Sequence, residues 1–160
     1  MLKYFSVFIL FCSGNFLFGD YEVSPEKMDL VREALIVNNR YYPDYYKITI
    51  NGERFNETTG RLWKERWDLI NDSIDFTGLR VLDLGTNIGL LPIFAMRYGG
   101  AQSAVGVDLT FTKRFKLLAE AFEVDAKFIA ANFKSPNYEN KIGSDYDIVF
   151  CLSLFYWFKG

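Results

Sequence analysis

The sequence predicts an α/β fold built on a doubly wound parallel sheet, and three observations support this. Apolar strand patterns alternate with amphipathic helix patterns from about residue 80 onward, which is typical of parallel strands joined by crossover helices. The run VLDLGTNIG, residues 81–89, leads from a buried strand into a glycine turn. The next strand pattern, AVGVD, ends on an acidic residue, Asp108.

The composition indicates a globular chain and limits the chemistry that it can perform. Of the 160 residues, 50% are hydrophobic and 24% are charged, which suits one domain with a real core. The formal net charge of −2 excludes a generally basic surface for nucleic acid, although a local basic patch stays possible. The chain has no histidine, which excludes a histidine-dependent triad, and we predict no metal site. Cys12 and Cys151 lie far apart, which favours a reduced compartment over a disulfide scaffold.

Three segments are predicted along the chain. Residues 1–19 form a hydrophobic segment of the kind found in signal peptides or membrane-associating helices, with Lys3 ahead of an apolar stretch. Gly14 and Asn15 interrupt this segment, which makes it a poor candidate for a membrane span. Residues 20–75 are predicted as a helical and hairpin extension, and residues 76–160 as the core that contains the sheet.

Local signals define the elements of the extension and of the core. Ser24 and Pro25 mark the start of a helix over residues 26–37, and Asn51-Gly52 is the preferred two-residue turn of a β-hairpin. The helical spacing of residues 61–71 predicts a second helix. In the core, we expect strands over residues 81–84, 104–107, 127–131 and 146–152, and helices over residues 88–98 and 112–122.

The glycine turn after the first core strand is the predicted ligand site, because ligands of such sheets bind beyond the carboxyl ends of the strands. Gly85 allows a sharp turn and a close backbone approach. Asn87 tolerates a positive φ and could also cap the following helix, and Gly89 would let that helix pack closely. Asp83 lies on the same strand face as Gly85, where a carboxylate can stabilise the loop amides or hold water near a cationic ligand.

The spacing of the turn argues against a nicotinamide site. The glycines follow G-x-x-x-G, whereas dinucleotide-binding turns follow G-x-G-x-x-G, in which the second glycine makes room for a pyrophosphate. Asp108 follows Gly85 by 23 residues, which is where a ribose-binding acid is expected. A nicotinamide-dependent oxidoreductase is therefore kept only as the least favoured alternative.

VLDLGTNIG followed by GVDL resembles motifs I and II of the class I S-adenosylmethionine-dependent methyltransferases, which have a Rossmann-like fold. The resemblance implies S-adenosyl-L-methionine as the cofactor, with its amino-acid part over the glycine turn, which includes Thr86. It implies that Asp108 binds the ribose hydroxyls, that Leu109 borders the adenine and that Asn132 lies near the adenine amine. The end of the fourth strand, from Cys151 onward, would face the methyl group.

The resemblance also bears on the helix over residues 61–71. We expect Trp63 and Trp67 in the core, and the alternative is that this helix lies over the cofactor. The basic residues of the helix are expected on a solvated face: Arg61, Lys64 and Arg66. Cys151 is expected as a small buried strand residue rather than a nucleophile, since no histidine is present to activate it.

In that family the sheet has seven strands in the order 3-2-1-4-5-7-6, and this chain ends just after the fourth. We therefore expect a C-terminally truncated, incomplete sheet. Its fourth strand would be an exposed edge, where a partner chain or a second copy could pair. A truncated or degenerate binding module without catalysis is thus an alternative to a methyltransferase.

The expected reaction is methyl transfer by in-line displacement, with the catalytic residues unknown. RNA, protein and small molecules all stay open as the methyl acceptor. The run VGVDLTFTKRFKLLAEAF more weakly resembles the wobble-uridine tRNA-modifying enzymes, which does not by itself decide the acceptor. Because S-adenosylmethionine is a cytosolic metabolite, we expect a cytoplasmic protein with at most weak membrane association through residues 1–18.

Overall fold

The computed structural model describes residues 21–36, 46–56, 61–110 and 112–152. Their central feature is a four-stranded parallel sheet in the order β5-β4-β3-β6, which confirms the predicted fold class. The strands are β3 (Arg80–Leu84), β4 (Ser103–Asp108), β5 (Lys127–Ala130) and β6 (Ile148–Phe150). Counted from β3, this order is 3-2-1-4, as in the methyltransferase sheet. The predicted hydrophobic segment over residues 1–19 lies outside the described residues.

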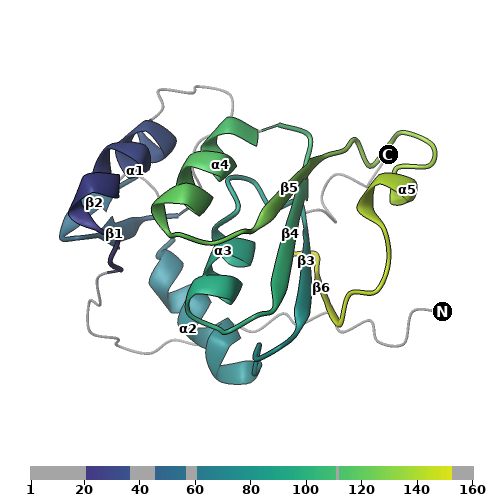
Figure 1. Ribbon diagram of the computed structural model, residues 1–160, viewed down its shortest axis with the longest axis horizontal. Helices are drawn as coiled ribbons and strands as arrows, with labels where there is room; N and C mark the ends of the chain where they lie inside the picture. The colour runs from purple at the N-terminus through teal and green to yellow at the C-terminus, as the bar shows by residue number, and fades with distance from the viewer. Residues whose placement is uncertain (1–20, 37–45, 57–60, 111, 153–160) are drawn as a thin grey trace.

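Helices cover the two faces of the sheet unequally. The helices α3 (Leu90–Arg97) and α4 (Thr112–Ala121) cross between strands on one face, while the short α5 (Glu139–Ile142) lies on the other (Figure 1). The helix α5 is not among the helices expected from the sequence, because one turn of helix is too short to leave a periodic pattern. On the α5 face, Ile142 packs with Leu82, Val107 and Ala131.

The extension contributes a 3-10 turn η1 (Pro25–Lys27), α1 (Met28–Leu35), the hairpin of β1 (Ile48–Ile50) and β2 (Glu53–Phe55), and α2 (Trp63–Ser73). The helix α1 packs along α4, on the side of the sheet that α3 and α4 cover (Figure 1). The buried Arg114 of α4 donates a hydrogen bond through Nε to the carbonyl of Ala34, near the end of α1. A cation at this position stabilises the free carbonyls of a helix C-terminus.

Asn51 joins the hairpin to the start of the described chain. It adopts a φ of 48° and Gly52 a φ of 78°, the left-handed pair that the predicted two-residue turn requires. Its side chain also accepts a hydrogen bond from Val23 N at 3.0 Å and donates one to Val23 O at 2.8 Å. One side chain therefore both shapes the turn and fixes the segment that leads into α1.

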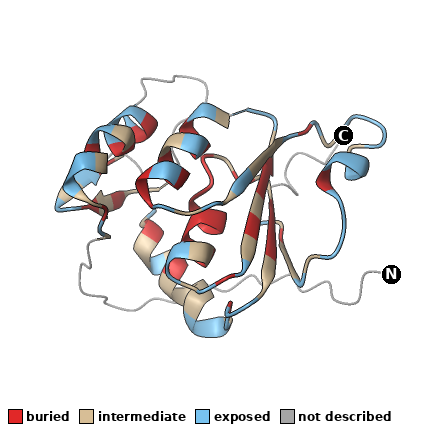
Figure 2. Cartoon of the chain, viewed as in Figure 1, coloured by how far each residue is buried: buried red, intermediate tan, exposed pale blue. Residues whose placement is uncertain are grey.

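One hydrophobic core holds the extension against the sheet. Phe94 of α3 is fully buried, and its ring contacts Tyr21, Trp63, Trp67 and Phe122 at centroid distances of 4.5 to 5.6 Å. The buried parts of the helices and strands face one another across this interface (Figure 2). Trp63 and Trp67 are 2% and 4% exposed, as expected for core residues. The α2 helix therefore belongs to the same core as α3.

The edge strand β6 is fixed at its start by a paired side chain. The Asp147 carboxylate accepts hydrogen bonds from Arg80 at its backbone N, Nε and NH2 atoms, at 2.8 to 3.0 Å. In return, Asp147 N donates to the Arg80 carbonyl at 2.9 Å. The predicted strand over residues 146–152 is shortened to three residues in the structure.

Two helix starts differ from the sequence prediction for backbone reasons. The helix expected over residues 88–98 begins at Leu90, because Gly89 has a φ of 87° and serves as the left-handed N-cap. The helix expected over residues 26–37 opens as the 3-10 turn η1 and ends at Leu35. Among the helices of the described residues, none is long and apolar enough to cross a membrane.

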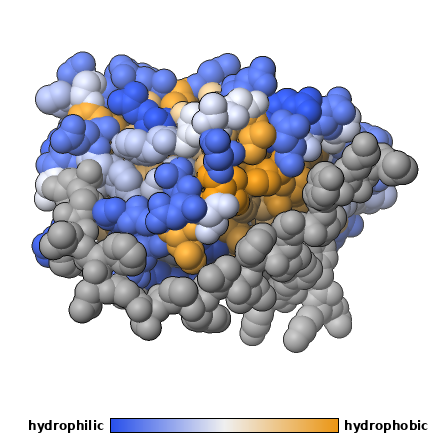
Figure 3. Space-filling model, turned by 90° about the horizontal axis from the view of Figure 1, so that it is seen from below, coloured by the Kyte–Doolittle hydropathy of each residue, from blue (hydrophilic) through white to orange (hydrophobic). Residues whose placement is uncertain are grey.

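Apolar surface is exposed on the face of the molecule seen in Figure 3, between hydrophilic regions. Four large apolar side chains are exposed within the described residues: Ile36, Tyr98, Leu109 and Leu152. Leu109 directly follows the carboxyl end of β4, and Leu152 lies shortly after the carboxyl end of β6. The candidate functional site lies at this end of the sheet.

Candidate functional site

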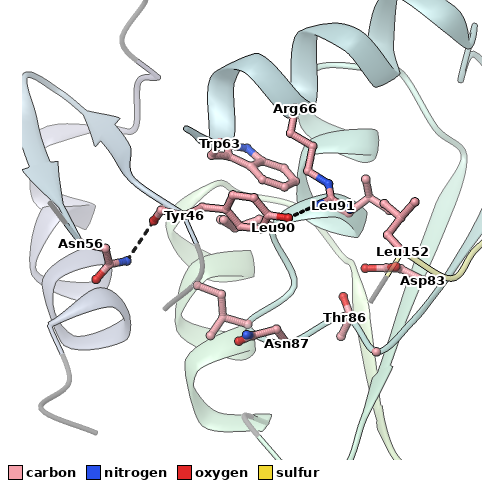
Figure 4. A pocket seen from close by; sticks show the side chains of 12 residues that line it. Tyr46, Asn56, Trp63, Arg66, Asp83, Thr86, Asn87, Leu90, Leu91 and Leu152 are labelled. Atoms are coloured by element: carbon pink, nitrogen blue, oxygen red, sulfur yellow. Dashed lines mark hydrogen bonds between the residues drawn. The ribbon is translucent and has the colours of Figure 1, made fainter. Parts of the chain in front are cut away.

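A pocket opens at the carboxyl ends of β3 and β6 (Figure 4). The chain runs from β3 to β4 and β5 on one side and then returns to β6 on the other, so this position is the switch point of the sheet. Ligands of open α/β sheets bind at such points. The pocket is lined by Tyr46, Asn56, Trp63, Arg66, Asp83, Gly85, Thr86, Asn87, Ile88, Leu90, Leu91 and Leu152.

The glycine turn forms the floor of the pocket in a conformation that few residues adopt. Gly85 has a φ of 75° and Asn87 a φ of 54°, which agrees with the tolerance of asparagine for this region. Two successive amides, Gly85 N and Thr86 N, donate to the Val107 carbonyl at 2.8 and 3.1 Å. The turn is thereby tied to β4 rather than to its own strand.

Asp108 holds the turn from the end of β4. Its Oδ2 accepts a hydrogen bond from Asn87 N at 2.8 Å, and its Oδ1 accepts one from Leu109 N at 2.7 Å. Each carboxylate oxygen keeps a further lone pair that could accept from a ligand hydroxyl. The acid that the sequence singled out is therefore beside the glycine turn, half-buried, and oriented by two backbone amides.

Two glycines allow the turn, the helix and β4 to approach closely. A Cβ on Gly89 would lie 2.0 Å from the Phe115 ring. A Cβ on Gly106, in the middle of β4, would lie 2.7 Å from Thr86 and 2.9 Å from Phe115. The close packing predicted for Gly89 is thus confirmed, and Gly106 serves the same purpose without having been singled out in the sequence.

Asp83 is a buried carboxyl at the base of the pocket, only 6% exposed. Burial raises its pKa to about 7, an effect that the negative charge of Asp108 reinforces. The Thr86 hydroxyl and the positive charge of Arg66 act in the opposite direction. The group therefore changes its charge near neutral pH, where an unperturbed aspartate would be fully ionised.

Arg66 lies in the pocket, and the predicted solvated face for this residue is wrong. Its NH1 donates a hydrogen bond to the Tyr46 hydroxyl, and its guanidinium lies 5.2 Å from the centroid of the Tyr46 ring (Figure 4). Burial lowers its pKa, and the charge of Asp83 partly offsets this. Arg66 thus supplies a partly buried cation on the opposite wall from the glycine turn.

Three pocket-lining residues each have a buried polar atom that lacks a hydrogen-bond partner within the described residues. The atoms are Trp63 Nε1, a donor, Asn87 Oδ1, an acceptor, and Thr86 Oγ1, which can donate or accept. Buried polar groups are nearly always hydrogen-bonded, so unsatisfied atoms at a pocket wall call for a polar ligand or ordered water. The pocket thus offers neutral hydrogen-bonding groups together with a cation, Arg66, and a carboxyl group, Asp83.

The other predicted site residues do not line the pocket. Leu109 is 58% exposed beside Asp108. Asn132 follows β5, is exposed, and its Oδ1 accepts a hydrogen bond from Lys134 N at 2.9 Å. Cys151 is half-buried after β6, while its neighbour Leu152 lines the pocket.

Eight lining residues were not among the predicted site residues, and four of these come from the extension: Tyr46, Asn56, Trp63 and Arg66. Tyr46 and Asn56 flank the hairpin, and the Asn56 Nδ2 donates to the Tyr46 carbonyl at 3.3 Å. Trp63 and Arg66 come from α2. The extension therefore forms one wall of the pocket.

No family model matches the chain, but known proteins resemble it in sequence. It is 30% identical over 93 residues to a tRNA U34 carboxymethyltransferase of Helicobacter acinonychis (strain Sheeba), covering 57% of this chain and 35% of that protein. It is 29% identical over 93 residues, with the same two coverages, to the protein of that name from Helicobacter pylori. The chain spans about a third of the length of these curated relatives.

Solved structures also resemble the chain. A SAM-dependent methyltransferase from Thiobacillus denitrificans, in complex with S-adenosyl-L-homocysteine, is 25% identical with a TM-score of 0.42. The alignment covers 78% of this chain and 42% of that one. A mutant of MtNAS in complex with S-adenosylmethionine is 14% identical with a TM-score of 0.43, over 77% of this chain and 44% of that one.

Proposed function

We propose that this chain binds S-adenosylmethionine at the pocket above the glycine turn and forms the cofactor-binding part of a methyltransferase. The observation that carries the proposal is the position of the pocket. It lies at the switch point of a sheet with the order β5-β4-β3-β6, and it combines Asp83, Gly85 and Leu152 from the ends of β3 and β6. The sequence similarity to two enzymes named tRNA U34 carboxymethyltransferase supports the same conclusion.

The polar groups of the pocket fit the amino-acid end of this cofactor. A carboxylate can take hydrogen bonds from the Arg66 guanidinium and the unpartnered Trp63 Nε1. An ammonium can be held by Asp83 and by the unpartnered Asn87 Oδ1. Asp108, at the end of β4, is left to accept from the ribose hydroxyls, as the motif resemblance implies.

The residues of this chain bind and orient rather than carry out bond chemistry. The cofactor supplies an electrophilic methyl group, and holding the acceptor in line with it can provide most of the acceleration. The apolar side chains Leu90, Leu91 and Leu152 exclude water from the inner part of the pocket. No histidine is present to act as a base. We assign no general base to the chain.

We further propose a tRNA nucleoside as the acceptor, on the strength of the names of the two sequence relatives. The chain spans only about a third of the length of these relatives. That this chain recognises tRNA is therefore itself part of the proposal. Protein and small-molecule acceptors are the alternatives. Transfer of label from radioactive cofactor to total tRNA, compared with total protein, distinguishes them.

Calorimetric titration of the full chain with S-adenosylhomocysteine tests cofactor binding, with NAD as the ligand control. We expect binding by the wild type and a loss of at least about tenfold in affinity for Asp108→Ala, which removes the acceptor that holds both the turn and the ribose. Asp125→Ala is the matched control, because Asp125 is an exposed aspartate on the loop between α4 and β5. That variant should bind as the wild type does.

Binding of NAD in place of S-adenosylhomocysteine would contradict the proposal and favour an oxidoreductase. Equal affinities of the wild type and Asp108→Ala would contradict the role of Asp108. Binding of S-adenosylhomocysteine without transfer of label to any acceptor would leave a cofactor-binding module that lacks catalysis.

A further inference from the structure

Asp83 is enclosed by both flanking strands and by the extension. In the sheet it pairs with Gly106 of β4 and with Phe150 of β6, so its backbone lies in the interior of the sheet. Its side chain lines the pocket, and its exposed fraction is 6%. A charged carboxylate in such a position must be balanced by a neighbour or a ligand, because burial without compensation is costly.

The structure gives Asp83 only partial compensation of its own, of which the Thr86 hydroxyl is one part. On the side of α2, Asp83 faces Arg66, and the two act on each other through their charges without forming an ion pair in the described part of the chain. Arg66 is engaged instead by the hydroxyl of Tyr46, which precedes β1. From β4, Asp108 adds a second negative charge. After β6 the nearest titratable side chain in the sequence is Cys151, and the first turn of α3 carries no charged residue.

The ammonium of a ligand's amino-acid end would supply the missing charge. Placed at the Asp83 side of the pocket, it favours the ionised carboxylate over the neutral acid. The carboxylate of the same end can pair with the guanidinium of Arg66, which lies with Tyr46 on the side of α2 (Figure 4). The free pocket and the occupied pocket therefore differ in the number of protons that they hold.

We propose that binding of the cofactor, through the ammonium group of its amino-acid end, releases a proton from Asp83 to the solvent, so that pH controls occupancy of the pocket across the neutral range. In this step the Asp83 O–H bond breaks, the proton passes to the buffer, and the resulting carboxylate pairs with the ligand ammonium. The inference rests on the proposed function, because it requires a ligand that carries such an end. It adds that binding of the ligand is coupled to deprotonation of Asp83, which the resemblance to methyltransferases does not imply.

Burial of Asp83 raises its pKa to about 7, which fixes the range in which the effect is seen. At pH 8 most molecules have Asp83 ionised and ready, and at pH 6 most must first lose the proton. The apparent affinity for S-adenosylhomocysteine should therefore be about tenfold weaker at pH 6 than at pH 8. Near pH 7, roughly half a proton should be released for each ligand bound.

Titration calorimetry with the full chain measures both quantities. Dissociation constants are taken at pH 6, 7 and 8, and proton release at pH 7 is read from buffers that differ in their ionisation enthalpy. The matched ligand is 5′-methylthioadenosine, which has the nucleoside but no amino-acid end. Its affinity should not change over this range, and its binding should release no proton from Asp83. This comparison uses the wild-type protein alone.

Two variants add a second, independent comparison. Asp83→Asn removes the titrating group with little change in volume, so its binding of S-adenosylhomocysteine should be weaker and independent of pH. Asp125→Asn, at an exposed position, should keep the wild-type dependence. Circular dichroism shows whether each variant is folded before it is titrated.

The outcomes separate this inference from the proposed function. Binding of S-adenosylhomocysteine with the same affinity at pH 6 and 8 and no proton release would overturn the inference and leave the cofactor site standing. Equal pH dependence for 5′-methylthioadenosine would overturn it as well, because the effect would then belong to the nucleoside part. Absence of binding by the folded protein at pH 8 would overturn both.

Discussion

Asp83 combines burial in the sheet with a place in the lining of the pocket, so its charge opposes the stability of the fold. Its carboxyl is buried in the middle strand of the sheet, where an apolar or neutral side chain would be more favourable. Residues of binding sites often oppose the stability of the fold in this way. At the scale of single residues, this position is where stability and binding should conflict most clearly.

We expect Asp83→Asn to raise the free energy of unfolding of the ligand-free protein by roughly 1–3 kcal/mol at pH 8. The folded pKa of Asp83 is about 7, above the unfolded value of 3.8. Its contribution to stability is therefore fully present below pH 3.8 and is lost as the pH rises through 7. Urea unfolding at pH 8 and pH 4 measures this, and the two proteins should converge at pH 4. A wild type that is the more stable protein at pH 8 would contradict the expectation.

At the scale of elements, β6 depends on one exposed ion pair. It is three residues long, it is hydrogen-bonded only to β3 among the described strands, and the bidentate contact between Asp147 and Arg80 fixes its start. This contact lowers the pKa of Asp147 to about 2. Since Leu152 lines the pocket after β6, the position of this strand also sets one wall of the site.

We expect Asp147→Ala to lower the Tm at pH 7 by loosening β6. The folded pKa of Asp147 is about 2 and the unfolded value is 3.8, so the stabilising effect is present above pH 3.8 and is lost as the pH falls toward 2. Thermal unfolding of both proteins between pH 7 and pH 3 should show a difference in Tm that shrinks with acid. Asp145→Asn is the control, because it changes a neighbouring carboxylate that makes no such bidentate contact. A difference in Tm that stays constant with pH would point to a cause other than the ion pair.

At the scale of the whole molecule, the extension and the sheet share one core. Phe94 is the side chain that joins them, because its ring touches Tyr21 and Trp63 of the extension as well as Phe122 after α4. Residues of α1, of the hairpin and of α2 belong to the same buried cluster as those of β3 and β4. Elements that share a core in this way unfold together.

We expect Phe94→Ala to cost about 3–5 kcal/mol and to shift the unfolding of both parts equally. Tryptophan fluorescence follows α2 through Trp63 and Trp67, and far-ultraviolet circular dichroism follows the chain as a whole. The two transitions should coincide in the wild type and in the variant. Two separate transitions, of which only the fluorescence transition shifts, would instead indicate that residues 20–75 unfold as an independent unit. The sequence analysis places this extension in a segment of its own, separate from the core.

The sheet could be predicted from sequence because its signals are local. Apolar runs, the glycines at 85 and 89 and the acid at 108 each report on a few neighbouring residues, and together they define strands, turn and order. Arg66 could not be placed in this way. On its own helix it shares the basic composition of Arg61 and Lys64, and only the docking of α2 and the hairpin over β3 turns it toward the pocket. Such contacts between distant segments leave no periodic pattern.

The hydrogen bonds of Asp108 have a consequence for the thermodynamics of any ligand that binds above the turn. Asn87 is held at a positive φ, and its amide is already bonded to the carboxylate, as is that of Leu109. The loop therefore has its binding geometry before a ligand arrives, and the entropy of ordering it was lost during folding. Such preorganisation leaves less disorder to be removed on association, so this loop should add little unfavourable entropy to binding.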